Sequence, residues 1–143
     1  MSKPFRTSKK ITAIPSIPEG EGAQVRRIIG TPDLLRLDPF LLFDHFSAKL
    51  PAGFPDHPHR GFETVTYMLS GEMHHEDSRG NKGLIRAGDC QWMTAGKGVV
   101  HAEMPGSWDE ESIGLQLWIN LPIKDKMCEP QYQEISRTNV QIQ

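Results

Sequence analysis

Thirteen glycines and eleven prolines are spread along the 143 residues of this chain rather than gathered in one region. Proline interrupts helices and central strands, and glycine favours turns, so these residues divide the chain into short segments. Long apolar patterns with the 3.6-residue helical period are scarce as a result. Short runs rich in β-branched and aromatic residues lie between the turns, which is typical of an all-β sandwich or barrel.

The apolar and β-branched runs predict eight strands. They cover residues 25–29, 40–46, 64–69, 72–75, 83–85, 90–93, 99–103 and 115–120. Thr31 followed by Pro32 suits the start of one helical turn over residues 31–37, because threonine caps helices and proline fits the first helical position. Residues 47–61 are rich in Pro and Gly, and we expect a loop there.

Composition narrows the class of protein. The net charge is −2, the pI is about 6.3 and the mean hydropathy is −0.47, which argues against a strongly electrostatic nucleic-acid binder. No apolar run is long enough to span a membrane, and the N-terminal residues lack the apolar region of a secretory signal. Cys90 and Cys128 allow at most one disulfide, so we expect reduced thiols in a soluble intracellular protein of one domain.

The segment GFPDHPHRGFE, residues 53–63, carries two histidines on either side of a proline. In an extended backbone, side chains at i and i+2 point to the same side, so His57 and His59 can reach one ion. Pro58 lacks an N–H and is therefore excluded from the middle of a central strand. The pair is expected at a strand entrance or at a sheet edge, where a ligand can approach.

His101 and Glu103 form a second pair with the same spacing on another expected strand. If the two pairs converge, they supply three imidazoles and one carboxylate, a set that suits a divalent first-row metal without naming it. On octahedral iron(II) four protein ligands leave two positions open, as O₂ activation requires, whereas on tetrahedral zinc they close a structural site. Glu63, four residues after His59, competes with Glu103 for the carboxylate role.

The remaining histidines, His45, His74 and His75, are less well placed to be ligands. His74 and His75 are adjacent, so in a strand they face opposite sides. The sequence AGKG at 95–98 lacks both the first glycine and the Ser/Thr of a P-loop, and neither a nucleophile elbow nor a CxxC motif is present.

Several longer stretches together resemble the pirin family of the cupin superfamily. They are LDPF at 37–40, GFPDHPHRGFETV at 53–65, QWMTAG at 91–96, HAEMP at 101–105, GLQLW at 114–118 and EPQYQE at 129–134. The resemblance implies a cupin fold, a double-stranded β-helix or jelly-roll barrel, that holds one metal. The metal is usually iron, although other divalent first-row metals suit the same ligands. The family's ligands map onto His57, His59, His101 and Glu103, which assigns the carboxylate role to Glu103 rather than Glu63.

The resemblance also carries expectations about domains and compartment. It covers roughly residues 8–135, so we expect residues 1–135 to form the N-terminal cupin domain and residues 136–143 to be a divergent tail. Pirins have two cupin domains, and the second is not represented in this chain. Apolar surface that faces the second domain is then exposed, which favours a homodimer or lowers solubility. The family implies a cytoplasmic or nuclear protein, and the charge and hydropathy given above lead us to expect neither direct nucleic-acid binding nor membrane binding.

Three functions follow from the resemblance and the metal site. The first is a quercetin 2,3-dioxygenase-like oxidoreductase that acts on a flavonol-like substrate and O₂, with Glu103 as the catalytic base. Its pocket walls are expected from residues 47–56, Met73, Met93 and Gln116. The second is an iron-dependent transcriptional coregulator that binds a transcription factor without turnover. The third is a catalytically silent cupin in which the metal only stabilises the barrel.

Overall fold

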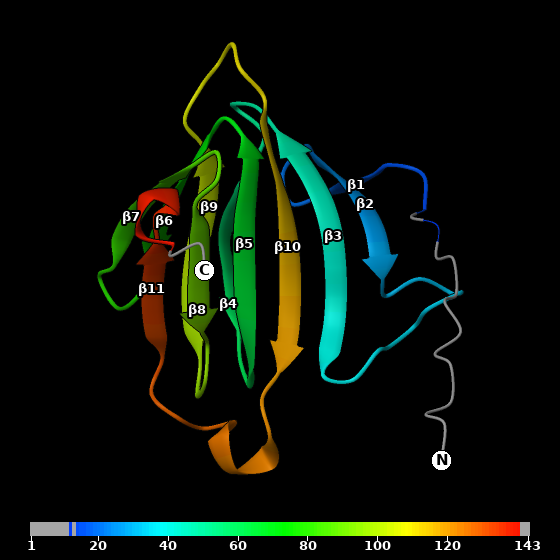
Figure 1. The fold of residues 1–143 in the computed structure, drawn as a ribbon, viewed down its shortest axis with the longest axis vertical. Coiled ribbons are helices and arrows are strands. Elements are labelled where there is room, and N and C mark those ends of the chain that lie inside the picture. The colour runs from blue at the N-terminus through cyan, green and yellow to red at the C-terminus, as the bar shows by residue number, and fades with distance from the viewer. Residues whose placement is uncertain (1–11, 13, 141–143) are drawn as a thin grey trace, which may run out of the picture.

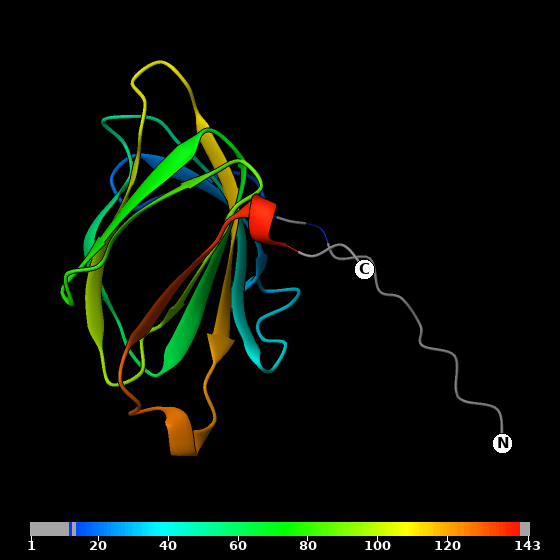
Figure 2. The ribbon, with the colours of Figure 1, turned by 60° about the vertical axis from the view of Figure 1, so that its left-hand side comes forward.

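A computed structural model of the protein describes residue 12 and residues 14–140, which form two facing antiparallel sheets (Figures 1 and 2). The larger sheet has the order β1-β2-β3-β10-β5-β8-β11. Its strands are β1 (Ile17–Glu19), β2 (Ala23–Ile29), β3 (Phe40–Ala48), β10 (Ser112–Asn120), β5 (Phe62–Ser70), β8 (Cys90–Thr94) and β11 (Gln131–Ile135). The smaller sheet, β4-β9-β6-β7, contains β4 (Phe54–His59), β9 (Val99–Pro105), β6 (Glu72–Asp77) and β7 (Lys82–Arg86).

The all-β prediction is confirmed, and all eight expected strands form. Three further strands were not predicted: β1, β4 and β11. β4 lies inside the segment 47–61, which we expected to be a loop. The proline and glycine content of that segment does not indicate a strand, although an edge strand tolerates proline. The expected helical turn at residues 31–37 was also wrong. Thr31 does cap a local turn, where its Oγ1 accepts a hydrogen bond from the N–H of Leu34 at 3.2 Å, but a helix does not follow.

Pro58 explains the position of β4. The strand occupies the edge of the smaller sheet and pairs only with β9 among the described strands. An edge strand has one side without ladder hydrogen bonds, so a residue that lacks an N–H is tolerated there. The expectation that the two histidines lie at a sheet edge is therefore confirmed.

Alternating side chains of the two sheets fill the space between them. One apolar cluster contains Val25, Phe46, Met68, Met73 and Ile85, all nearly inaccessible to solvent. A second cluster lies toward β11, where Met93, Ala95 and Val99 pack against Tyr132. This interior is polar in its middle, since Gln91, His101 and Glu103 are buried there as well.

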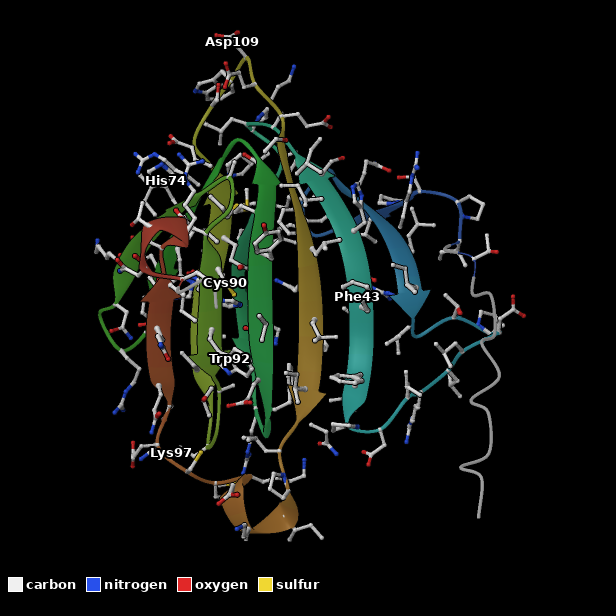
Figure 3. All side chains as sticks on the ribbon, in the orientation of Figure 1. Phe43, His74, Cys90, Trp92, Lys97 and Asp109 are labelled. Carbon is white, nitrogen blue, oxygen red and sulfur yellow. The ribbon has the colours of Figure 1, made fainter. Side chains whose placement is uncertain are left out.

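The outer face of the larger sheet is also rich in apolar side chains (Figure 3). One row crosses four strands in register and consists of Phe43, Leu117, Val65 and Trp92. Tyr67 and Leu69 are more than two-fifths exposed on the same face. Among the described residues, no helix has the length and apolar character that crossing a membrane requires.

Candidate metal centre

Strand β4 delivers two histidines to the interior. Its alternation exposes Asp56 and Pro58 and turns His57 and His59 inward, as the i, i+2 spacing predicts. The imidazole of His57 is oriented by its own strand, because its Nδ1 lies 2.8 Å from the carbonyl oxygen of Pro55. That carbonyl accepts only, so Nδ1 carries the proton and the lone pair of His57 is on Nε2.

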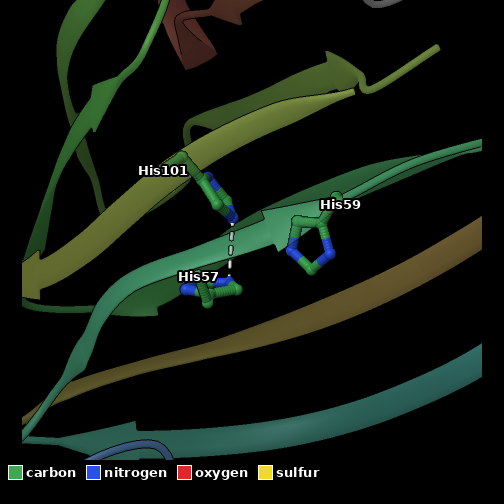
Figure 4. Close-up of side chains that lie close together, drawn as sticks. All are labelled: His57, His59 and His101. Carbon is green, nitrogen blue, oxygen red and sulfur yellow. Dashed lines mark hydrogen bonds between the residues drawn. The ribbon is translucent and has the colours of Figure 1, made fainter. Parts of the chain in front are cut away.

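The third histidine comes from the neighbouring strand β9. His101 pairs in register with His57, and its side chain is completely buried. The Nε2 atoms of His57 and His101 lie 3.0 Å apart (Figure 4). One ligand nitrogen from each of His57, His59 and His101 lies within 4.8 Å of the others. Two nitrogens at 3.0 Å can both bind one ion at the usual distance of about 2.0–2.1 Å.

His59 supplies the clearest sign that this cluster fits a metal. Its Nε2 is buried, and within the described part of the chain it has no hydrogen-bond partner. A buried polar atom without a partner is costly and calls for an explanation, such as an ion. Burial first, and then the neighbouring His101 and His57, lower the pKa of His59 to about 3. The imidazole is therefore neutral at neutral pH, as metal binding requires.

Glu103 lies next to the histidines but is not part of the three-histidine cluster. Its side chain is buried on the same face of β9 as His101. Its Oε1 accepts a hydrogen bond from Thr66 Oγ1 at 3.1 Å, and its Oε2 accepts one from Gln116 Nε2 at 2.9 Å. Each carboxylate oxygen keeps a lone pair beside the hydrogen bond it accepts, and the role of Glu103 as fourth ligand stays a prediction.

The other residues considered from sequence lie outside the cluster. Glu63 accepts a hydrogen bond from Thr94 Oγ1 at 2.7 Å, and His74 is exposed. His75 is buried beside the cluster, with its Nδ1 3.3 Å from Nδ1 of His101. Sequence reasoning did not find this contact. The in-register pairing of β6 with β9 brings it about, and that pairing is decided only when the sheet forms.

A cavity of about 660 Å³ opens beside His57 and His59. Its walls include the aromatic side chains of Phe46, Phe54, Phe62 and Trp118, of which Phe62 and Trp118 stack with ring centroids 4.7 Å apart. Gln116 lines it as predicted, and so do residues 54–56 from the expected 47–56 segment. Met73 and Met93 do not line this cavity, because both are inside the apolar clusters.

A sequence profile of the Pirin family matches residues 22–119, more than half of the chain. The chain belongs to the pirin family. A pirin-like protein from Solanum lycopersicum is 59% identical over 139 residues, covering 97% of this chain and 47% of that protein. Human pirin is 60% identical over 123 residues, covering 85% of this chain and 42% of human pirin. The chain thus spans about half the length of these curated relatives.

Solved structures of related proteins confirm the expected cupin fold. A quercetin 2,3-dioxygenase from Acinetobacter baumannii superposes with a TM-score of 0.78 at 38% identity, covering 90% of this chain and 48% of that one. The bacterial pirin YhhW from Escherichia coli, in complex with nickel(II), superposes with a TM-score of 0.77 at 27% identity. That match covers 87% of this chain and 56% of YhhW. Three histidines of this pirin are thus positioned to bind a metal.

Proposed function

We propose that this pirin is an Fe(II)-dependent dioxygenase of the quercetin 2,3-dioxygenase type, with His57, His59, His101 and Glu103 as metal ligands. The observation that carries the proposal is the convergence of three histidine side chains beside a cavity with aromatic walls. Cavities of this size usually hold small molecules, with apolar walls and a few polar groups that orient them. The quercetin dioxygenase among the related structures supports a flavonol-like substrate.

The aromatic walls are suited to a planar substrate. The stacked rings of Phe62 and Trp118 offer a flat apolar surface near His59, whose ring is 5.0 Å from Phe62 and 5.1 Å from Trp118. A flavonol that lies against them excludes water from the histidines. When bound, iron(II) would supply O₂ activation and hold the substrate's oxygen atoms.

Glu103 is the group proposed to take the enol proton of the substrate. Hydrogen bonds hold its carboxylate in place, and the chain of contacts continues to Trp118, whose Nε1 donates to Gln116 Oε1 at 3.2 Å. Gln116 therefore presents its amide N–H to Glu103 in a fixed orientation. Both carboxylate oxygens thus accept a hydrogen bond, which orients the group for taking a proton from a bound substrate.

Oxygen uptake tests this proposal. The protein is loaded with Fe(II) without air, O₂ is admitted, and uptake is followed with and without quercetin. We expect uptake coupled to loss of quercetin, and a decrease of about 10²- to 10⁴-fold in Glu103→Gln, since a general base contributes about that factor. His74→Asn, at an exposed position of β6, is the matched control. Undiminished flavonol oxidation by Glu103→Gln would contradict the base role.

A second candidate function is a metal-dependent protein-binding module, such as an iron-dependent transcriptional coregulator in the nucleus. The outer face of the larger sheet favours it, because Tyr67, Leu69 and Trp92 are exposed there and apolar patches of this kind mark interaction sites. Metal-dependent binding of a transcription factor, or of a second copy of the chain, without quercetin turnover would support it. A metal that only raises stability would indicate a silent cupin.

We also propose that residues 1–135 form one cupin domain and that residues 136–143 are a tail. Strand β11 ends at Ile135, and a 3₁₀ helix (Arg137–Asn139) follows it. Residues 1–11, 13 and 141–143 lie outside the described residues. The cytoplasm or the nucleus is the compartment we propose, as the family resemblance implies.

A further inference from the structure

Behind His101, on the side away from the cavity, two buried side chains of β6 form a chain of polar contacts. Nδ1 of His101 lies 3.3 Å from Nδ1 of His75, and Nε2 of His75 lies 3.5 Å from Oδ2 of Asp77. The side chains of His75 and Asp77 are only 1% and 2% exposed. β6 pairs with β9 so that Asp77 faces His101 and His75 faces Glu103.

The turn after β6 keeps Asp77 an acceptor. The N–H groups of Arg79 and Asn81 donate to its Oδ1 at 2.9 and 3.0 Å, and Asn81 Nδ2 donates to its Oδ2 at 2.8 Å. Burial alone would raise the pKa of Asp77, but these hydrogen bonds lower it below its ordinary value. An ionised carboxylate has no proton to donate, so Nε2 of His75 has to carry the proton in this contact.

The proton positions then follow along the chain. A neutral His75 with its proton on Nε2 presents a lone pair on Nδ1. That lone pair accepts a hydrogen bond only if His101 carries its own proton on Nδ1. Nε2 of His101 then presents its lone pair toward the lone pair on Nε2 of His57, 3.0 Å away, which is an arrangement suited to an ion bound between the two nitrogens.

We propose that His75 is a positioning residue that, together with Asp77, holds His101 in the tautomer able to bind a metal through Nε2. This inference rests on the metal site proposed above. Hydrogen-bonded partners behind a ligating histidine fix its ring and its tautomer, and their loss typically weakens metal binding by 10- to 100-fold. His57 has the simpler arrangement, in which a backbone carbonyl performs this task.

Tyr132 of β11 keeps His75 in place from the opposite sheet. The two rings stack with centroids 4.5 Å apart and planes 26° from parallel. The phenol oxygen of Tyr132 is itself bound, because it accepts from Gln91 Nε2 at 3.1 Å and donates to Glu134. The stacking depends on a flat ring, whereas the contact with His101 depends on a nitrogen lone pair. Substitutions can therefore separate the two roles of His75.

Three variants make the separation. His75→Phe keeps a flat ring against Tyr132 and removes the acceptor. His75→Asn keeps an acceptor close to the position of Nδ1, since its side-chain oxygen occupies about that place. Asp77→Asn keeps the size of the side chain but offers an N–H to His75, which drives the proton of His75 to Nδ1 and that of His101 to Nε2. His74→Asn is the matched control, because the neighbouring side chain is exposed.

Two measurements test the proposal on the full chain. Long-range ¹H–¹⁵N NMR of the metal-free protein identifies the protonated nitrogen of His101, and calorimetric titration with Ni²⁺ gives the affinity. We expect protonated Nδ1 in wild type, His75→Asn and His74→Asn, and a growing population with protonated Nε2 in His75→Phe and Asp77→Asn. The latter two should bind Ni²⁺ about 10- to 100-fold more weakly, with His75→Asn recovering most of the affinity.

The proposal is overturned if His101 keeps the same tautomer in His75→Phe and Asp77→Asn, or if both bind Ni²⁺ within twofold of wild type. Failure of the proposed metal site looks different, since wild type would then bind no Ni²⁺ while the NMR spectra still report the tautomer, and failure of the dioxygenase activity alone would appear only in the oxygen-uptake experiment. A variant that does not fold would show it in the dispersion of its amide spectrum. If one of His75→Phe, His75→Asn and Asp77→Asn does not fold, the other two still test whether the tautomer of His101 depends on His75 and Asp77.

Discussion

The three clustered histidines differ in the hydrogen-bond partners of their ring nitrogens, and these partners determine which nitrogen is available to a metal. His57 and His101 each use Nδ1 for a contact away from the cavity, which leaves Nε2 facing the cluster. His59 has a buried Nε2 that no described residue contacts through a hydrogen bond. The metal-free site therefore contains two buried imidazoles, those of His59 and His101, for which protonation is unfavourable.

Acid should destabilise the metal-free protein for this reason. The pKa values of His59 and His101 are lowered to about 3 in the fold, whereas an unfolded histidine titrates near pH 6.5. Between about pH 6.5 and 3 the unfolded chain binds more protons, so the free energy of unfolding decreases as the pH falls through this range. Urea unfolding with EDTA at pH 7.5, 6, 5 and 4 measures the slope.

His59→Leu is the control for this effect. The variant removes one titrating imidazole, so its slope should be smaller by about one proton, or about 1.4 kcal/mol per pH unit, between pH 6 and 4. Carboxylates that titrate in the same range contribute equally to both proteins. Equal slopes in wild type and His59→Leu would show that His59 is not buried in its neutral form.

At the level of elements, short turns bring the ligand-bearing strands together. The turn at residues 95–98 joins β8 to β9 and contacts two other segments. The carbonyl of Gly96 accepts from the N–H of Gly61, just after β4, at 2.8 Å. The N–H of Lys97 donates to the carbonyl of Cys128 at 2.9 Å. This turn therefore connects the end of the strand that bears His59 to the start of the strand that bears His101.

Gly96→Ala should damage this connection. The residue has φ of +49°, and a Cβ would overlap the backbone carbonyl oxygen of Cys128. We expect a loss of about 3 kcal/mol or more in the free energy of unfolding, because backbone strain adds to a clash that only backbone movement relieves. Nickel affinity should fall as well. Urea unfolding and calorimetric titration measure the two effects.

Gly80→Ala serves as the comparison. Gly80 also has a positive φ, of +87°, but a Cβ there meets nothing within 4 Å. The cost should be about 1–2 kcal/mol, from the left-handed backbone conformation alone. If both substitutions cost the same, the backbone of Cys128 does not approach Gly96 closely enough to exclude a Cβ, which would contradict the expected clash.

For the whole molecule, a bound ion would join the edge of the smaller sheet to its interior. His57 and His59 lie on the edge strand β4, and His101 lies on the next strand, β9. Edge strands open most readily, because fewer contacts hold them. Metal binding by all three histidines would therefore stabilise the fold where it is least protected.

Nickel should raise the melting temperature of the metal-free protein. At a free concentration 100-fold above Kd, an ion that binds only the folded state adds about 2.7 kcal/mol, which for a chain of this size is about 5–10 °C. Hydrogen exchange should slow in β4 more than in β2 or β3. His59→Leu should lose this response while its metal-free stability stays the same or increases by about 1 kcal/mol, since an unpartnered polar atom is removed. An equal nickel response in this variant would exclude His59 as a ligand.

Local spacing predicted much of this architecture. The i, i+2 rule placed His57 with His59 and His101 with Glu103, and Pro58 placed the first pair at a sheet edge. The same rule was uninformative for Met73 and Met93. Alternation says that a side chain points inward, but it does not distinguish a packed interior from a cavity wall, because both are reached from the same face of a strand.

By itself, the sequence determined that the protein is all-β and which histidines are paired along each strand. These two features depend on residues that are close together in the chain, where backbone geometry decides the outcome, whereas the pirin family was recognised from the resemblance of longer stretches and then from the matching family profile. Only the tertiary structure decided that His75 and Asp77 stand behind His101, and that Thr66 and Gln116 hold the carboxylate of Glu103. Those contacts depend on the register between strands and on the distance between two sheets, which packing of the whole interior sets.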